Sequence, residues 1–125
     1  MNTIGYFEIQ SSNVRREVEF YSAVFGWNFV EEKALPIEYY RISTGTINGG
    51  ILQRPAAAPM PGAGANAFTC SVEVVNFDNT AALILQHGGR VAMPKFAIPG
   101  KCWQGYFLDA DNNVFGIFEV DEQAK

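Results

Sequence analysis

Histidine, cysteine and basic residues are scarce in this chain of 125 residues. It has one His and two Cys, and its nine Lys and Arg are outnumbered by thirteen Asp and Glu, so that the net charge is −4. The basic residues are scattered and form no stripe that could neutralise phosphates, which argues against nucleic-acid binding. No apolar run approaches the about 18 residues that a membrane helix needs, so no membrane association is expected.

The two cysteines, Cys70 and Cys102, lack the close spacing of a CxxC motif or of a Cys/His cluster. The first ten residues, MNTIGYFEIQ, have no cationic segment followed by a long apolar one, as export signals do. We therefore expect a cytoplasmic protein whose thiols are reduced rather than joined in a disulfide.

The hydrophobic content of 48% and aromatic content of 14% exclude disorder and predict a single globular domain. One segment, residues 54–66 (RPAAAPMPGAGAN), has almost nothing to bury. Its Pro, Ala and Gly composition predicts a linker between a first module, residues 1–53, and a second, residues 67–125.

Module one begins with a strand pattern, in which Phe7 and Ile9 alternate with polar residues. A helix is predicted next, capped by Asn13 and ended by Gly26, with an apolar stripe that includes Val14, Val18, Tyr21 and Phe25. Three β-prone runs follow, at residues 27–31, 38–43 and 46–53. The predicted order is βαβββ.

Module two repeats this order. Phe68, Cys70 and Val72 alternate inward in a predicted strand, and a helix from about Asp78 ends at Gly88-Gly89. Further strands are predicted at residues 90–94, 104–109 and 114–120, separated by a loop at 95–103 (KFAIPGKCW) and a turn at 109–113. The two modules therefore suggest an internal duplication. The residue pairs that it equates are Tyr6 with Thr69, Gly26 with Gly89, Tyr40 with Tyr106, and Gly50 with Gly116.

The strings FEIQSSNVRREVEFYSAVFGW, YYRISTGTINGG and GYFLDADNNVFGIFE resemble the glyoxalase, bleomycin-resistance and extradiol dioxygenase superfamily, also called vicinal oxygen chelate proteins. The resemblance covers essentially the whole chain, although Ala110 replaces the usual Pro of the late turn. It implies an α+β fold in which two βαβββ modules form a curved mixed sheet around a concave site. The helices would lie on the convex side, and the chain would pair as a homodimer.

In metal-dependent members of the superfamily, four positions on the first and last strands of the modules supply the metal ligands. The resemblance places them here on Tyr6, Gly50, Thr69 and Gly116. Two glycines, a phenol and a hydroxyl are a poor set for a transition metal, so no metal and no other cofactor is expected. A dioxygenase is also disfavoured, because a site of two His and one carboxylate needs more than the one His of this chain.

Strand alternation places Glu8 beside Tyr6 on the predicted concave face, opposite Phe7 and Ile9. Glu8 and Tyr6 would contact a ligand and help to orient it, and Glu8 could instead serve as a catalytic base, unless it is an ordinary residue at the rim of the sheet. The further candidates for ligand contact are residues of the same face, aromatic residues near it and the two glycines that would enlarge a cavity: Thr69, Ser71, Tyr40, Tyr106, Trp103, Gly50 and Gly116. Each has an alternative as ordinary packing or polar lining.

These observations favour a protein that binds a small, partly aromatic organic molecule without a metal. One alternative is a lyase or isomerase of glyoxalase type that uses Glu8 as its base. Another is a regulatory or assembly module whose concavity is filled by its own aromatic side chains.

Overall fold

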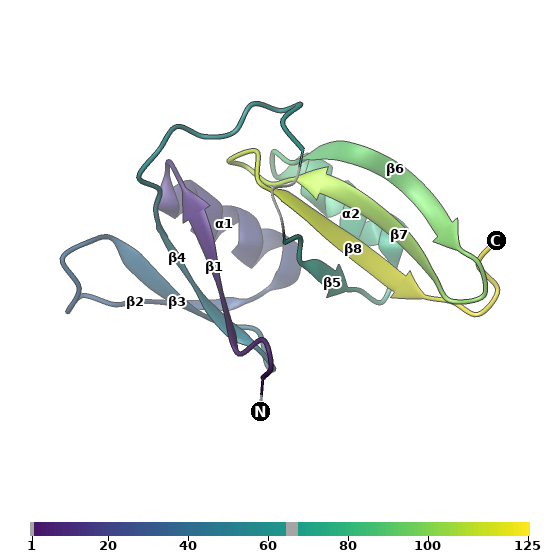
Figure 1. Ribbon diagram of the computed structural model, residues 1–125, viewed down its shortest axis with the longest axis horizontal. Coiled ribbons are helices and arrows are strands. Elements are labelled where there is room, and N and C mark those ends of the chain that lie inside the picture. The colour runs from purple at the N-terminus through teal and green to yellow at the C-terminus, as the bar shows by residue number, and fades with distance from the viewer. Residues whose placement is uncertain (1, 65–67) are drawn as a thin grey trace. The chain divides into compact units, whose positions relative to one another are not determined.

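The βαβββ order occurs twice along the chain in the computed structural model, which describes residues 2–64 and 68–125 (Figure 1). The chain divides into two compact units, Met1–Ala58 and Pro59–Lys125, which contain modules one and two. The boundary lies within the predicted linker, whose last two residues, with residue 67, lie outside the described part. No described helix is long and apolar enough to cross a membrane.

Module one is a four-stranded mixed sheet with one helix. Its elements are β1 (Tyr6–Ser11), α1 (Val14–Phe25), β2 (Asn28–Glu31), β3 (Tyr39–Ser43) and β4 (Asn48–Gln53). The strand order is β1-β4-β3-β2, in which β1 and β4 are parallel and the other neighbours antiparallel. Helix α1 packs against β1, β2 and β4 and so covers one face of this sheet (Figure 1).

Module two has the same topology. Its elements are β5 (Ser71–Glu73), α2 (Phe77–Gln86), β6 (Arg90–Ile98), β7 (Cys102–Leu108) and β8 (Val114–Val120). The order β5-β8-β7-β6 again places the first and last strands side by side and parallel. Helix α2 packs on β6, β7 and β8. The predicted α+β class and the two βαβββ modules are confirmed.

The helix ends follow the sequence signals. The Asn13 side chain accepts a hydrogen bond from the backbone N–H of Arg16, and Gly26 ends α1 in the left-handed region, with φ at 69°. In α2 the cap is Asn76, which accepts from the N–H of Asn79. The N–H of Gly89 returns to the carbonyl of Ile84, as expected of a helix that stops at a glycine pair.

Each core lies between the helix and its sheet. In module one the ring of Trp27 stacks on that of Tyr21 with the centroids 5.4 Å apart and meets the ring of Phe7 at a tilt, and Ile51 is fully buried. The apolar stripe of α1 is rotated slightly from its predicted position. Val14 and Tyr21 are buried as expected, but Glu17 and Val24 lie in the core while Val18 and Phe25 are half-buried. Neighbouring positions such as 17 and 18, or 24 and 25, both fit an apolar stripe with steps of three and four residues. Sequence spacing therefore does not determine which of them faces the core.

Two predicted segments of module two differ from the structure. The expected loop at 95–103 is a hairpin, because β6 continues to Ile98 and β7 begins at Cys102 after a turn with Gly100 at a φ of 73°. The first strand of the module is shorter than expected. Phe68 and Cys70 precede β5, and both are exposed, so the inward alternation predicted for them is wrong.

Candidate functional site

The candidate site of module one lies on the face of its sheet opposite α1, which we call the helix-distal face. In the parallel pair of β1 and β4, Glu8 lies opposite Gly50, and in the antiparallel pair of β3 and β4, Arg41 also lies opposite Gly50. Directly opposed residues share a face of the sheet. Phe7 instead reaches the aromatic core under α1. The predicted orientation of Glu8 away from the helix is therefore confirmed.

Three side chains on this face form a chain of hydrogen bonds. The hydroxyl of Tyr39 donates to Oε2 of Glu8 at 3.1 Å, and the hydroxyls of Tyr39 and Tyr6 are 2.7 Å apart. Tyr39 is 8% exposed and Tyr6 is 41% exposed, so this series of hydrogen bonds runs from the interior toward the surface. Burial raises the pKa of the Tyr39 phenol, and its hydrogen bonds with Tyr6 and Glu8 raise it further.

Gly50 is required by Tyr39. A Cβ atom built on Gly50 would overlap the hydroxyl of Tyr39, whose ring end lies directly over the glycine. The sequence interpretation, in which Gly50 enlarges a cavity, needs correction, since the phenol fills the space that the glycine leaves. Sequence reasoning did not select Tyr39. The alternation of side chains along β3 would have identified it. Arg41 lies opposite Gly50, so Tyr39, two residues before Arg41, lies on the same face, but this inference needs the register of β3 against β4.

The cation Arg41 lies next to these hydrogen-bonded side chains, but it is already paired with Glu32. Nε of Arg41 donates to Oε2 of Glu32 at 3.0 Å, and this bond raises the pKa of Arg41 and lowers that of Glu32. Because the Arg41 charge is paired with Glu32, the Glu8 carboxylate is left as the excess charge among these groups.

Module two has a neutral arrangement at the matching place. Ser71 lies opposite Gly116, as Glu8 lies opposite Gly50. Nε2 of Gln104 donates to the Ser71 hydroxyl at 3.2 Å, and a Cβ on Gly116 would meet both side chains. Gln104 is therefore the counterpart of Tyr39, and the predicted equivalence of the two glycines is confirmed by their registers.

The predicted equivalence of Tyr40 and Tyr106 is wrong by one residue. Tyr106 lies opposite Gly116, so its counterpart is Arg41, whereas Tyr40 lies opposite the buried Ile51. Tyr40 is thus on the helix side of its sheet, away from Glu8. Tyr106 remains on the helix-distal face, where its ring stacks on Phe96 with the centroids 6.4 Å apart.

Trp103 does not lie in a capping loop. It is in β7 opposite Glu119, on the helix side of the sheet, and its indole N–H donates to Asp121 at 2.9 Å. Nζ of Lys95 lies 4.8 Å from the Trp103 ring and 5.3 Å from that of Phe77. Trp103 therefore packs within its own module. Thr69 lies just before β5 and is half-buried, outside the strand in which it was expected.

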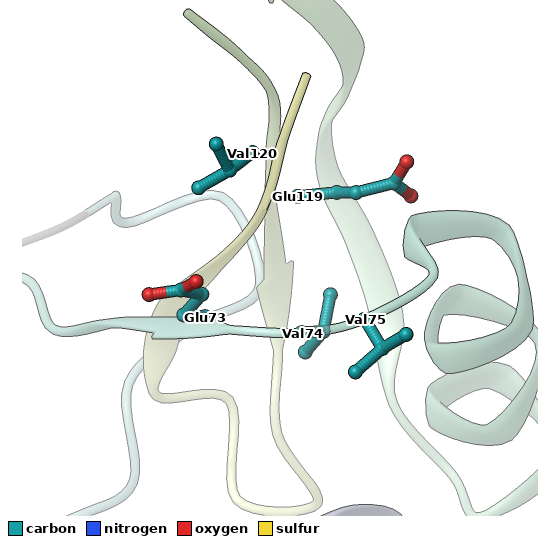
Figure 2. A pocket seen from close by; sticks show the side chains of 5 residues that line it. All are labelled: Glu73, Val74, Val75, Glu119 and Val120. Carbon is teal, nitrogen blue, oxygen red and sulfur yellow. The ribbon is translucent and has the colours of Figure 1, made fainter.

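An open hollow of about 450 Å³ lies at the edge of module two, where β5 meets β8. Figure 2 shows that the carboxylates of Glu73 and Glu119 point away from each other there. Glu119 is engaged at the start of α2, where its Oε1 accepts the backbone N–H of Phe77 at 2.6 Å. The hollow therefore lacks a pair of converging acidic groups.

The turn at 109–113 is built around a buried Asp109. Its carboxylate accepts from the N–H groups of Asp111 and Asn113 and from the Asn113 side chain, while Asn112 has a φ of 63°. These bonds within the turn make it an Asx-type turn. The sequence predicted a turn here, and that prediction is confirmed.

The donors present do not fit a metal ion. Glu8 is bonded by Tyr39, the glycines contribute no side chain, and Ser71 accepts from Gln104. Among residues 2–64 and 68–125, no three His, Cys, Asp or Glu side chains gather into a possible metal site. Within the modules, the helix-distal faces instead offer hydroxyl, carboxamide and carboxylate groups beside aromatic rings.

Paired βαβββ modules with the first and last strands of each lying parallel define the fold class of this chain. Residues 3–117 match the model of the Glyoxalase/Bleomycin resistance protein/Dioxygenase superfamily. The chain belongs to this superfamily, as its sequence resemblance suggested.

Solved structures agree on the fold. A glyoxalase/bleomycin resistance protein/dioxygenase family enzyme from Burkholderia phytofirmans PsJN is 20% identical, with a TM-score of 0.75 over 94% of this chain and 98% of the other. The hypothetical protein SA1046 from S. aureus is 16% identical, with a TM-score of 0.74 over 96% and 99%. The fosfomycin resistance protein FosX from Listeria monocytogenes, as an E126Q mutant with Mn(II) and 1S,2S-dihydroxypropylphosphonic acid, is 11% identical, with a TM-score of 0.78 over 97% and 94%. A comparison with curated protein sequences finds no match.

Proposed function

We propose that this protein binds a small, partly aromatic organic molecule without a metal, in keeping with its resemblance to the drug-sequestering branch of the superfamily. The observation that carries the proposal is the hydrogen-bonded chain of Tyr6, Tyr39 and Glu8 on the helix-distal face of module one. It holds polar atoms in fixed positions on the sheet face opposite α1, and fixed polar groups of this kind are typical of those that orient a ligand.

Two further features support a ligand that is organic and partly aromatic. Module two presents the stacked rings of Phe96 and Tyr106 on its own helix-distal face. The FosX structure shows that a protein of this fold holds a small organic molecule. Its Mn(II) is not carried over to this chain, because Tyr6, Gly50, Thr69 and Gly116 are a poor set of ligands for a transition metal.

Native mass spectrometry of the purified protein tests the proposal. We expect a small organic molecule to copurify and to be released on denaturation. Its affinity is then measured by calorimetry for the wild type and for Glu8→Gln. Because the variant keeps the shape but removes the charge, we expect a loss of about 1.5–3 kcal/mol in binding, with little change in stability.

Glu31→Gln is the matched control. Glu31 is an exposed residue of β2 that pairs with Tyr40 of β3, so this variant removes the same charge from the other face of the same sheet. Equal affinity of Glu8→Gln and the wild type would place Glu8 at an uninvolved rim. If neither a copurified molecule nor added aromatic compounds bind, the proposal is wrong and the regulatory or assembly alternative is favoured.

The homodimer implied by the family resemblance stays a prediction. Light scattering at tens of micromolar protein should give twice the chain mass of 13.8 kDa. A particle of one chain mass at that concentration would contradict it.

A further inference from the structure

The hydrogen bonds of the Tyr6, Tyr39 and Glu8 chain have a direction that the distances and chemistry determine. An ionised carboxylate only accepts, so Tyr39 must use its one hydroxyl hydrogen toward Oε2 of Glu8, 3.1 Å away. The Tyr39 oxygen can then only accept in its 2.7 Å contact with Tyr6. Tyr6 is therefore the donor of that bond, and both hydroxyl hydrogens are used within the chain.

The atoms left over on this chain are acceptors. The oxygen of Tyr6 keeps a lone pair, and Glu8 keeps its second carboxylate oxygen. Both residues are exposed, whereas Tyr39 is 8% exposed and lies beneath them over Gly50. A molecule that approaches this face through Tyr6 and Glu8 thus meets acceptors.

The neighbouring cation is paired. Arg41 shares the helix-distal face with Glu8, and its Nε is bonded to Glu32 at 3.0 Å, which balances its charge. The Nη groups of Arg41 are further donors, so the preference inferred below concerns the atoms of Tyr6 and Glu8 and is tested by variants of their hydrogen-bonded chain.

We propose that Tyr39 is a positioning residue that makes the site selective for ligands bearing a hydrogen-bond donor, such as a hydroxyl, an amine or an ammonium group. The inference rests on the proposed function and names the chemical class of its ligand. Tyr39 acts through Tyr6 and Glu8. It donates to Glu8 and accepts from Tyr6, and so takes up the hydrogen that Tyr6 would otherwise offer to a ligand acceptor.

Two uncharged probes separate this effect from the general attraction of an acidic protein for cations. Benzyl alcohol can donate a hydrogen bond, and benzyl methyl ether has the same ring and oxygen but can only accept. Dissociation constants are measured by titration while the backbone amide signals of the full chain are followed by NMR. We expect the alcohol to bind the wild type about fivefold or more tightly than the ether, with shifts in β1, β3 and β4.

Tyr39→Phe is the decisive variant. Without the Tyr39 oxygen, Tyr6 regains its hydrogen for the ligand, so we expect the ether to bind more tightly and the preference for the alcohol to shrink to about twofold or less. A purely structural role for Tyr39 would weaken both probes alike. Tyr40→Phe is the matched control, since it removes the same atom from the neighbouring residue on the helix side of β3, and it should retain the full preference.

Tyr6→Phe provides a second test if Tyr39→Phe does not fold. It removes an acceptor at an exposed position, so the alcohol should bind several-fold more weakly while the ether changes little. Ether binding equal to that of the alcohol in the wild type, or an unchanged preference in a folded Tyr39→Phe, would overturn the inference alone. Failure of both probes and of every copurified molecule to bind would overturn the proposed function with it.

Discussion

Modules one and two place different chemistry at the same point of the same backbone. Beside Gly50, module one has a carboxylate and a phenol, Glu8 and Tyr39, whereas beside Gly116 module two has the hydroxyl of Ser71 and the carboxamide of Gln104. One arrangement carries a charge and the other is neutral. The two modules therefore share the register and the glycine but differ in the polar groups around it.

The shared glycine has a physical reason in both modules. At each place a side chain from the preceding antiparallel strand reaches across the last strand to bond a residue of the first. A Cβ in its path would overlap Tyr39 in module one and would meet Ser71 and Gln104 in module two. The glycine therefore permits a polar bridge across the sheet, and this requirement remains when the bridging residues change.

The largest effect that we expect is on stability and comes from the hydrophobic cores, which occupy equivalent places in the two modules. Ile51 and Ile117 are counterparts, and both are fully buried, with 0% exposure. Changing either to Ala should lower the free energy of unfolding by about 2–5 kcal/mol, because it removes buried apolar contacts and leaves a cavity. Urea unfolding measures both. A loss below about 1 kcal/mol in one module only would show that its core is not packed as described.

The glycines should give a smaller and unequal effect. Gly50→Ala forces the Tyr39 ring to move, whereas Gly116→Ala meets the ends of two short, rotatable polar groups. We expect a loss of about 1–3 kcal/mol for Gly50→Ala and less for Gly116→Ala. Adding Tyr39→Phe to Gly50→Ala removes the overlapping oxygen and should recover part of the loss. Equal losses at the two glycines, with no recovery in the double variant, would contradict this account.

Local signals in the sequence predicted most of the fold. The caps Asn13 and Gly26, the strand alternation around Phe7 and the repeated βαβββ order each depend on neighbours in the chain, and each is confirmed. The hairpin at 95–103 was missed because Pro94 predicts the end of a strand, whereas β6 continues past it. The strand does so with irregular pairing, as the register shifts on both sides of Met93 show.

The site was less predictable because it depends on pairing between strands. Strand parity alone oriented Glu8 correctly, but the choice between Tyr39 and Tyr40 requires the register of β3 against β4, where a slip of one residue exchanges the faces. Trp103 was misplaced for the same reason. The position of its strand was unknown, so its face could not be assigned.

The two bridges should also differ in alkaline titration, because Tyr39 of module one titrates and its counterpart in module two, Gln104, does not. The pKa of the Tyr39 phenol is raised in the folded state, so folding favours its protonated form. The stabilisation this gives is complete below the ordinary tyrosine pKa of about 10 and is lost as the pH rises above it. Phenolate absorbance should show one late-titrating tyrosine, and Tyr39→Phe should remove that late step. If all tyrosines titrate together near pH 10 in the folded wild type, Tyr39 is not held as described.

The smallest expected effect is that of a chelator, for which we expect no change at all. A transition metal would need several carboxylate or imidazole ligands, and module one offers at this place the single carboxylate of Glu8, which already accepts from Tyr39. Module two offers neutral groups there. Treatment with EDTA should therefore leave the melting temperature unchanged, since removal of a structural metal would remove folding free energy. Elemental analysis is the complementary measurement, because a kinetically trapped ion could survive EDTA. One tightly held Zn, Ni, Mn or Fe per chain would contradict the prediction that the polar groups of the two modules leave a transition metal without adequate ligands.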